Sequence, residues 1–147
     1  MSISTRQKQR IWLIIAFIVV SYFASKYSPE HMFSQSSQPI SIEKLFQQKQ
    51  SNVQLEVTGN VIKLLRDDVN GSRHQRFIIK LASGHTLLIA HNIDLAHRVD
   101  ALYLGDEITA YGEYEWNSEG GVLHWTHHDP ENNHPHGWIR HHGLQYQ

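Results

Sequence analysis

Hydrophobic and polar residues alternate over most of the region between residues 53 and 127. A period of two residues is typical of strands that bury one face. In the first run, Val53, Leu55, Val57 and Val61 share one face. Five such runs predict strands at 53–61, 77–81, 86–90, 107–114 and 122–127. Turn residues separate several of them, most clearly the Asn-Gly pair at 70–71.

The period changes to that of a helix between the third and fourth predicted strands. Leu95, Val99 and Leu102 recur at intervals that place them on one helical face. Asn92 is a favourable N-cap, and Gly105 is a favourable residue to end the helix. The pattern therefore predicts a helix over this connection.

The order of three strands, one helix and two strands is the one expected of the five-stranded OB barrel, which is a mainly β fold. A small α+β sandwich is the alternative, because strand order cannot be read from one sequence. A further short helix is predicted after Ser41, where apolar residues recur between positions 42 and 46.

The N-terminal residues have a different character. Arg6, Lys8 and Arg10 precede an almost wholly apolar run over residues 11–25, and Lys26 closes it. This predicts a membrane-targeting helix, which is either an uncleaved signal anchor or a cleaved signal peptide. In both cases the positive-inside rule sends the rest of the chain across the membrane.

The sequence predicts three regions along the chain. Residues 1–26 are the signal anchor or signal peptide, residues 27–40 are a linker, and residues 41–147 are a single OB-like domain with a His-rich C-terminal part. The domain is expected in the cell envelope, anchored to the inner membrane and exposed to the periplasm, or secreted if the segment is cleaved.

The composition limits the kinds of functional site that the chain can form. The chain has 147 residues and no Cys, which leaves room for one domain and excludes disulfides, thiolate metal sites and Cys nucleophiles. Beyond the N-terminal segment, acidic residues outnumber basic ones, which argues against wholesale coating of nucleic acid.

Histidines are concentrated near the C-terminus. Seven of the 12 fall between His124 and His142, which is more crowding than a fold requires. An Asp-Pro step at 129–130 is expected to break the last strand, so that a loop folds back on itself. We predict a divalent metal site there, with zinc favoured and manganese or magnesium as alternatives. The candidate ligands are His124, His127, His128, Asp129, His134 and His136. The alternative is that these histidines are solvated, or only sequester metal.

A second cluster enters the second predicted strand. Arg73 and Arg76 flank His74, an arrangement suited to holding a phosphate beside a group that transfers protons. The alternative is a solvent-facing basic edge paired with Asp67 and Asp68.

Three further residues are candidates for ligand binding. Trp116 and Asn117 follow the fourth predicted strand, where the indole would stack on a base or a sugar, or else pack as an aromatic residue of the turn. His91 lies at the end of the third predicted strand.

Several literal strings resemble a small bacterial family classed as a domain of unknown function. They are RHQRF at 73–77, AHNIDLA at 90–96, GEYEWN at 112–117 and GGV-x-HWTHHDP at 120–130. The resemblance covers about residue 53 to the C-terminus. It implies relatives but no activity, so it assigns no catalytic residue.

The sequence supports two classes of function. The first is an exported metal-dependent hydrolase, acting on a phosphodiester in nucleic acid or a nucleotide, in which the histidines bind the metal and the residues at 73–76 act on phosphate. The second is a non-catalytic envelope module that binds an oligonucleotide or oligosaccharide, with metal buffering as a simpler variant. The hydrolase requires the C-terminal histidines and the cationic cluster to share one pocket.

Overall fold

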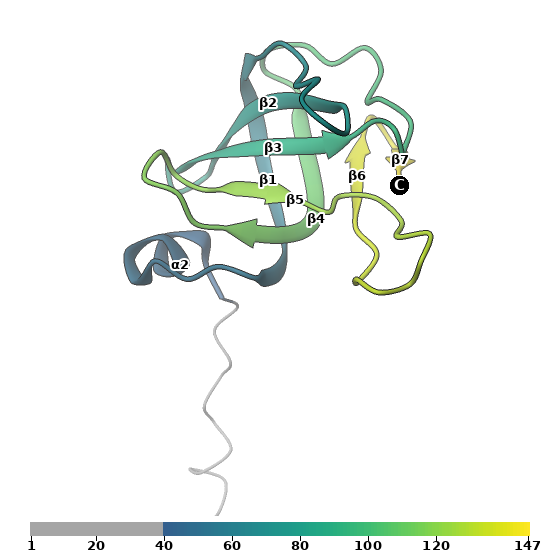
Figure 1. The fold of residues 1–147 in the computed structure, drawn as a ribbon. Coiled ribbons are helices and arrows are strands. Elements are labelled where there is room, and N and C mark those ends of the chain that lie inside the picture. Colours follow the sequence, from purple (N-terminus) through teal and green to yellow (C-terminus); the bar gives the residue numbers. More distant parts are fainter. Residues whose placement is uncertain (1–39) are drawn as a thin grey trace, which may run out of the picture. The chain divides into compact units, whose positions relative to one another are not determined.

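The alternating residues form strands that close into a barrel. The computed structural model describes residues 40–147, which make one compact unit (Figure 1). The barrel strands are β1 (Val53–Leu64), β2 (His74–Leu81), β3 (Thr86–Asn92), β4 (Glu107–Glu115) and β5 (Val122–His124). Pairing runs from β1 through β2, β3, β5 and β4, and β4 pairs again with β1. The prediction of a mainly β, five-stranded OB-like barrel is confirmed.

The period of two divides each strand between the core and the outer face. Inward positions on β2 to β5 are almost fully buried, for example Phe77, Ile89, Tyr114 and Leu123. Burying each large apolar side chain contributes about 1.5 to 3 kcal/mol. The outward positions are only partly covered, and they are therefore the places where these strands can carry polar chemistry.

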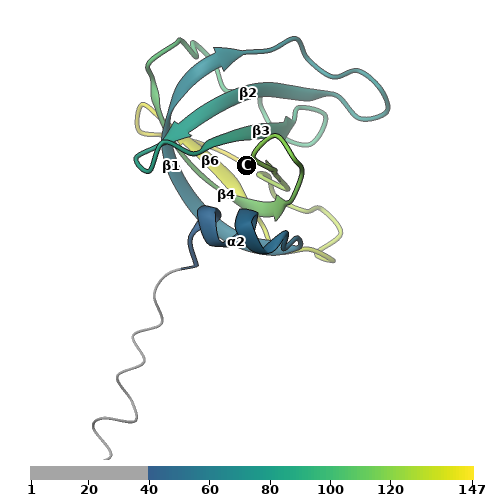
Figure 2. The ribbon, with the colours of Figure 1, turned by 90° about the vertical axis from the view of Figure 1, so that its left-hand side faces the viewer.

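The short helix predicted after Ser41 is α2 (Ile42–Gln48). Ser41 is its N-cap, and the hydroxyl accepts a hydrogen bond from the Lys44 backbone N–H. Ile42 and Leu45 are buried against the barrel core. The helix lies beside β4, as Figures 1 and 2 show.

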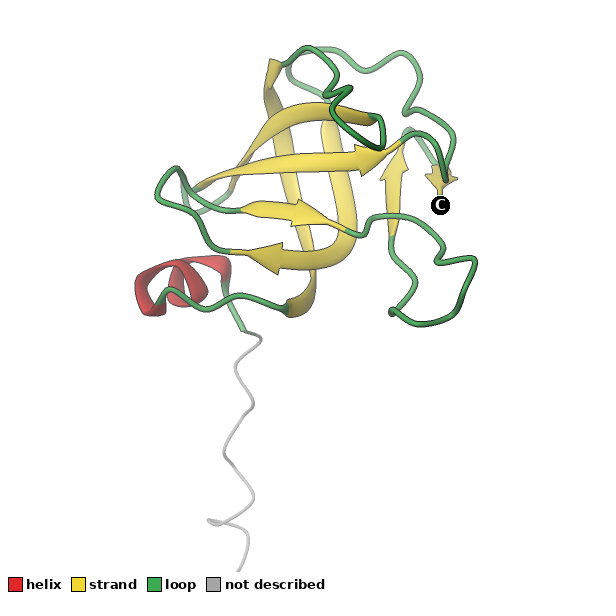
Figure 3. Ribbon diagram, in the orientation of Figure 1, coloured by secondary structure: helices red, strands yellow, loops and turns green. Residues whose placement is uncertain are grey.

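The helix expected between the third and fourth strands is absent. Among residues 40–147, α2 is the only helix, and the connection from β3 to β4 consists of turns (Figure 3). Backbone and side-chain groups of this connection bond to tertiary partners instead of to a helical turn: the Ile93 N–H donates to the Arg73 carbonyl. Val99 and Leu102 are buried in the core, whereas Leu95 is 47% exposed, so two of the three apolar residues pack inward from turns instead of from a helical face.

The C-terminal residues add two strands that the sequence did not predict. They are β6 (Trp138–His141) and β7 (Leu144–Tyr146), a hairpin that extends the sheet from β4 (Figure 1). The fifth strand ends at His124, three residues earlier than predicted, because Trp125 has a left-handed backbone with φ 52°. Residues 125–137 then form a loop that returns to β6.

Gly137 allows this loop to dock closely. A Cβ at this position would lie 1.9 Å from the Trp125 carbonyl oxygen and 2.5 Å from that of Tyr111. No other residue fits there without moving backbone.

The predicted membrane-targeting helix over residues 1–26 and most of the predicted linker lie outside the described residues. Within residues 40–147, none of the helical structure has the length and apolar character needed to cross a membrane.

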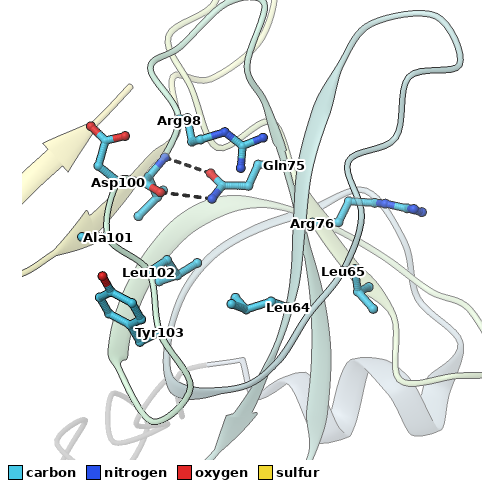
Figure 4. A pocket seen from close by; sticks show the side chains of 10 residues that line it. Leu64, Leu65, Gln75, Arg76, Arg98, Asp100, Ala101, Leu102 and Tyr103 are labelled. Atoms are coloured by element: carbon cyan, nitrogen blue, oxygen red, sulfur yellow. Dashed lines mark hydrogen bonds between the residues drawn. The ribbon is translucent and has the colours of Figure 1, made fainter.

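Gln75 holds the turn-rich connection to the barrel. Its buried side-chain amide donates to the Val99 carbonyl at 3.1 Å and accepts from the Val99 N–H at 2.8 Å, the paired dashed lines in Figure 4. Replacing Gln75 with Leu leaves two buried backbone groups without partners, so we expect a loss of about 2 to 4 kcal/mol of unfolding free energy. Urea titration measures this loss.

A second strand glutamine is a matched control. The Gln54 amide is also buried, but no described residue bonds to it. Gln54→Leu should therefore be neutral or stabilising. Equal losses in the Gln54 and Gln75 variants would contradict the role assigned to Gln75.

Candidate metal centre

A shallow groove crosses the outer face of the barrel. It is lined by Asp68, His74, Arg76, Ala90, Glu115, Val122 and His124. The small side chain of Ala90 pairs across strands with Arg76, and His124 lies one residue beyond the Ile89 to Leu123 pairing of β3 with β5. The groove is thus hollow at Ala90 and flanked by a guanidinium and an imidazole.

Three metal-ligating side chains converge at one side of this groove. Glu113 and Glu115 project from the outer face of β4, and His124 of β5 is the cross-strand partner of Glu113. One ligand atom from each residue lies within 4.8 Å of the other two. These residues come from two adjacent strands, so the barrel fixes their spacing.

The His124 ring nitrogen has no hydrogen-bond partner among the described residues. Nε2 is screened from solvent and lies 3.5 Å from Oε1 of Glu113, without making a hydrogen bond to it. Two ligands of one tetrahedral ion with bonds of 2.0 to 2.1 Å are about 3.4 Å apart. The pair therefore has the spacing of two ligands around an ion.

Burial keeps the His124 imidazole in its ligand form. It lowers the pKa of His124 below its usual value, and this effect exceeds the opposing influence of Glu113 and Glu115. A neutral imidazole can bind a metal, whereas a protonated one cannot.

The second oxygen of Glu113 is held by another histidine. His134 Nε2 lies 3.0 Å from Oε2 of Glu113, and the imidazole stacks on Trp125 at 4.2 Å between ring centroids. This contact leaves Oε1 of Glu113 facing His124. His134 thereby orients the carboxylate, a common role for residues that contact a metal ligand.

Asp129 organises the loop that carries His134. Its carboxylate accepts backbone N–H groups from Glu131, Asn133 and His134, at 3.1, 2.7 and 2.9 Å. Burial raises the pKa of Asp129, but these backbone donors together lower it further, so the net shift is downward. Both carboxylate oxygens of Asp129 bond to the backbone of the loop. Asp129 is therefore a structural residue and does not belong to the cluster of Glu113, Glu115 and His124.

The remaining predicted ligands also have local partners. The His127 Nδ1–H donates to the His128 carbonyl, and Nδ1 of His136 accepts from the Asp129 N–H. The rings of His128 and His136 stack at 3.9 Å. The loop folds back as expected, but within residues 40–147 these side chains do not meet at a common ligand position.

The cationic cluster divides between two places. His74 and Arg76 line the groove, whereas Arg73 forms an ion pair with Asp94, with 2.7 Å between Nε and Oδ1. The His74 Nδ1–H donates to the Ser72 carbonyl at 2.8 Å, which leaves the lone pair on Nε2 in the neutral tautomer. The expected shared pocket therefore contains His74, Arg76 and His124, but not Arg73.

Trp116 and Asn117 have structural partners instead of a ligand surface. The Trp116 ring packs on Phe46 of α2, and its N–H donates to the Phe46 carbonyl at 3.1 Å. The Asn117 side-chain oxygen accepts the backbone N–H groups of Glu119 and Gly121. The predicted stacking of Trp116 on a base or sugar is replaced by docking of α2.

His91 is a core residue, contrary to the expectation that it contacts a ligand. It is fully buried, Nε2–H donates to the His97 carbonyl, and Nδ1 accepts from the Thr126 hydroxyl. Both ring nitrogens are satisfied inside the protein, which leaves none for a ligand.

The two glutamates of the groove were not among the residues predicted from the sequence. Glu113 and Glu115 lie two residues apart in a strand, so the predicted alternation already placed them on one face. The missing information was the pairing that sets β5 and His124 beside them.

Residues 15–147 match the model of a family described as Protein of unknown function (DUF3465). The resemblance expected from the literal strings is thereby confirmed at the level of the family. No curated protein matches the chain.

His91 should make stability depend on pH. Burial lowers the pKa of His91 to about 4, whereas an unfolded chain has a His pKa near 6.5. The unfolded state therefore binds the proton first, and stability falls as pH decreases from 6.5 toward 4. The expected contribution is about 3 kcal/mol.

Urea unfolding at pH 7, 5.5 and 4.5 tests this expectation. His91→Gln should lose stability less steeply with acid than the wild-type protein, and the exposed control His128→Gln should follow the wild type. Parallel pH profiles for wild type and His91→Gln would contradict this assignment.

Proposed function

The chain belongs to this family of proteins of unknown function, and from the groove we propose that it is a metal-dependent phosphodiesterase acting on nucleic acid or a nucleotide. The observation that carries the proposal is the spacing of His124 Nε2 and Glu113 Oε1, which are 3.5 Å apart and not hydrogen bonded. The cell-envelope location expected from residues 1–26 is part of the proposal.

We assign metal binding to Glu113, Glu115 and His124. One imidazole and two carboxylates suit zinc or manganese, and solvent can complete the coordination. A bound divalent ion would polarise a phosphate oxygen and lower the pKa of bound water. His134 would hold Glu113 in place by its 3.0 Å contact with Oε2.

Arg76 supplies the fixed positive charge on the opposite side of the groove. Its Nε donates to the Arg66 carbonyl at 3.1 Å, and Nη1 lies 3.9 Å from the Asp68 carboxylate. The guanidinium is thus anchored at Nε, with donors left to stabilise charge that develops on phosphate oxygens.

We assign proton transfer in hydrolysis to His74. Its neutral tautomer has a free lone pair on Nε2, so it accepts a proton as a water molecule attacks phosphorus. The P–O bond to the leaving alkoxide breaks, and the protonated imidazole can return a proton to that oxygen. Water and the diester thus become a monoester and an alcohol, with no other reactant.

The position of the groove favours an extended, phosphate-bearing ligand. It crosses β2, β3 and β5 beside the loop that joins β1 to β2, and OB barrels commonly bind oligonucleotides on the face of strands 2 and 3 near this loop. The same position supports the second candidate, a module that binds such a ligand without cleaving it.

Metal binding is the first test. We expect full-length protein to lose one equivalent of bound Zn²⁺ or Mn²⁺ in isothermal titration when His124 is changed to Ala or Glu115 to Gln. The exposed Glu119→Gln is the matched control and should bind as the wild type does. An unchanged stoichiometry and affinity in both groove variants would exclude this centre.

Turnover is the second test. The full-length protein is incubated with bis-p-nitrophenyl phosphate, single- and double-stranded DNA, and RNA, each with Zn²⁺, Mn²⁺ or Mg²⁺. We expect metal-dependent cleavage that falls about 10²- to 10³-fold in kcat/KM for Arg76→Ala and about 10²- to 10⁴-fold for His74→Ala.

Arg73→Ala is the matched control for Arg76→Ala, because Arg73 is paired with Asp94 outside the groove. It should keep wild-type kcat/KM. Retention of oligonucleotide without metal-dependent cleavage would support the binding module, and the absence of both would reject the phosphodiester ligand.

A further inference from the structure

We infer that the turn between β6 and β7 carries a second divalent metal site, formed by Asp106, His141 and His142. One ligand atom from each of the three lies within 4.8 Å of the others. Asp106 directly precedes β4, whereas Glu113 lies seven residues further along, which is about 23 Å in an extended strand. This site is therefore separate from the groove and does not depend on the proposed function.

The distances within the cluster suit one small ion. His141 Nε2 lies 2.9 Å from Oδ2 of Asp106, and His142 Nε2 lies 3.9 Å from Oδ1. Ligand atoms around a tetrahedral zinc ion are about 3.4 Å apart, between these two values. An ion would replace the proton that His141 shares with Asp106, with shifts of about half an ångström.

The surroundings combine one fixed ligand with an open side. The His141 side chain is 2% exposed, and Asp106 is held by the Tyr103 backbone N–H at 2.8 Å. His142 is 65% exposed, so an ion can enter from solvent beside it. The two imidazoles stack at 3.9 Å and present their Nε2 atoms to the same carboxylate.

The ligand types favour a particular class of metal. Two imidazoles and one carboxylate, with solvent as the fourth ligand, suit Zn²⁺ or Ni²⁺ and do not suit Mg²⁺ or Ca²⁺. The groove has one imidazole and two carboxylates, so it differs in accepting Mn²⁺ more readily. A metal at the turn would cross-link the β6 to β7 hairpin to the chain segment that enters β4.

The turn itself offers a variant that removes only the ligand. His142 and Gly143 both have positive φ, 47° and 78°, as in the two-residue hairpin turns that Asn-Gly forms well. His142→Asn should therefore keep the hairpin while removing one imidazole. Asp106→Asn keeps an oxygen to accept the Tyr103 N–H but removes the charge.

The experiment measures Zn²⁺ binding and zinc-dependent thermal stability of the full-length protein. We expect His142→Asn and Asp106→Asn each to lose one equivalent of zinc relative to the wild type. In the groove variant His124→Ala, the melting temperature should rise by about 10 °C when free zinc exceeds Kd about 100-fold, and adding either substitution to that variant should remove most of the rise. Mg²⁺ should not raise the melting temperature of the His124→Ala variant.

Two controls make the result decisive. His136→Asn removes an exposed histidine outside both clusters and should bind zinc as the wild type does. The metal-free melting temperature of His142→Asn should stay close to that of the wild type, which establishes that the hairpin is intact. Full zinc binding by His142→Asn, or an equal loss in His136→Asn, would overturn the site.

Discussion

The register of β4 against β5 is the constraint on which the groove depends. It places Glu113 opposite His124 on the outer face, while Tyr114 and Leu123 point into the core as the neighbouring pair. A slip of one residue would turn the charged side chains into the core and the apolar ones to solvent, so burial of Tyr114 and Leu123 fixes the chemistry outside. The core therefore positions the candidate metal ligands on the outer face.

The crowded histidines do not form one site, because the protein uses them in different ways. His127 donates to the backbone of the loop, His134 orients a carboxylate, and His136 accepts a backbone donor at the turn stabilised by Asp129. His124 brings to the groove a buried ring nitrogen, Nε2, that has no hydrogen-bond partner among the described residues. Imidazole is suited to all of these roles since it both donates and accepts and packs like an aromatic ring. Crowding in sequence is thus weak evidence for a shared metal, and the partner of each ring nitrogen is stronger evidence.

Features set by local periodicity could be predicted from the sequence, whereas features decided by tertiary partners could not. The five barrel strands and the Ser41 cap arise from alternation and capping chemistry. The helix predicted after Asn92 does not form, since Gln75 and Arg73 bind the backbone of that connection. Tryptophan is a residue type that often stacks on bases or sugars, but Phe46 of α2 packs on the Trp116 ring. Glu113 and Glu115 were on the correct face of a predicted strand, yet their partner on β5 is set by barrel closure, which no local pattern contains.

The charges of the groove explain why phosphate binding and metal binding should be coupled. Without an ion, the carboxylates of Glu113 and Glu115 stand close together beside the groove and Asp68 lies near Arg76, so the negative charge would oppose a phosphate. In the proposed function, a divalent ion on Glu113 and Glu115 would neutralise two of these charges and leave Arg76 to act with it on one anion. A site that served only to buffer metal would need neither the guanidinium across the groove nor the hollow at Ala90. The arrangement of charge is therefore better matched to a ternary complex of protein, ion and phosphate than to storage of the ion alone.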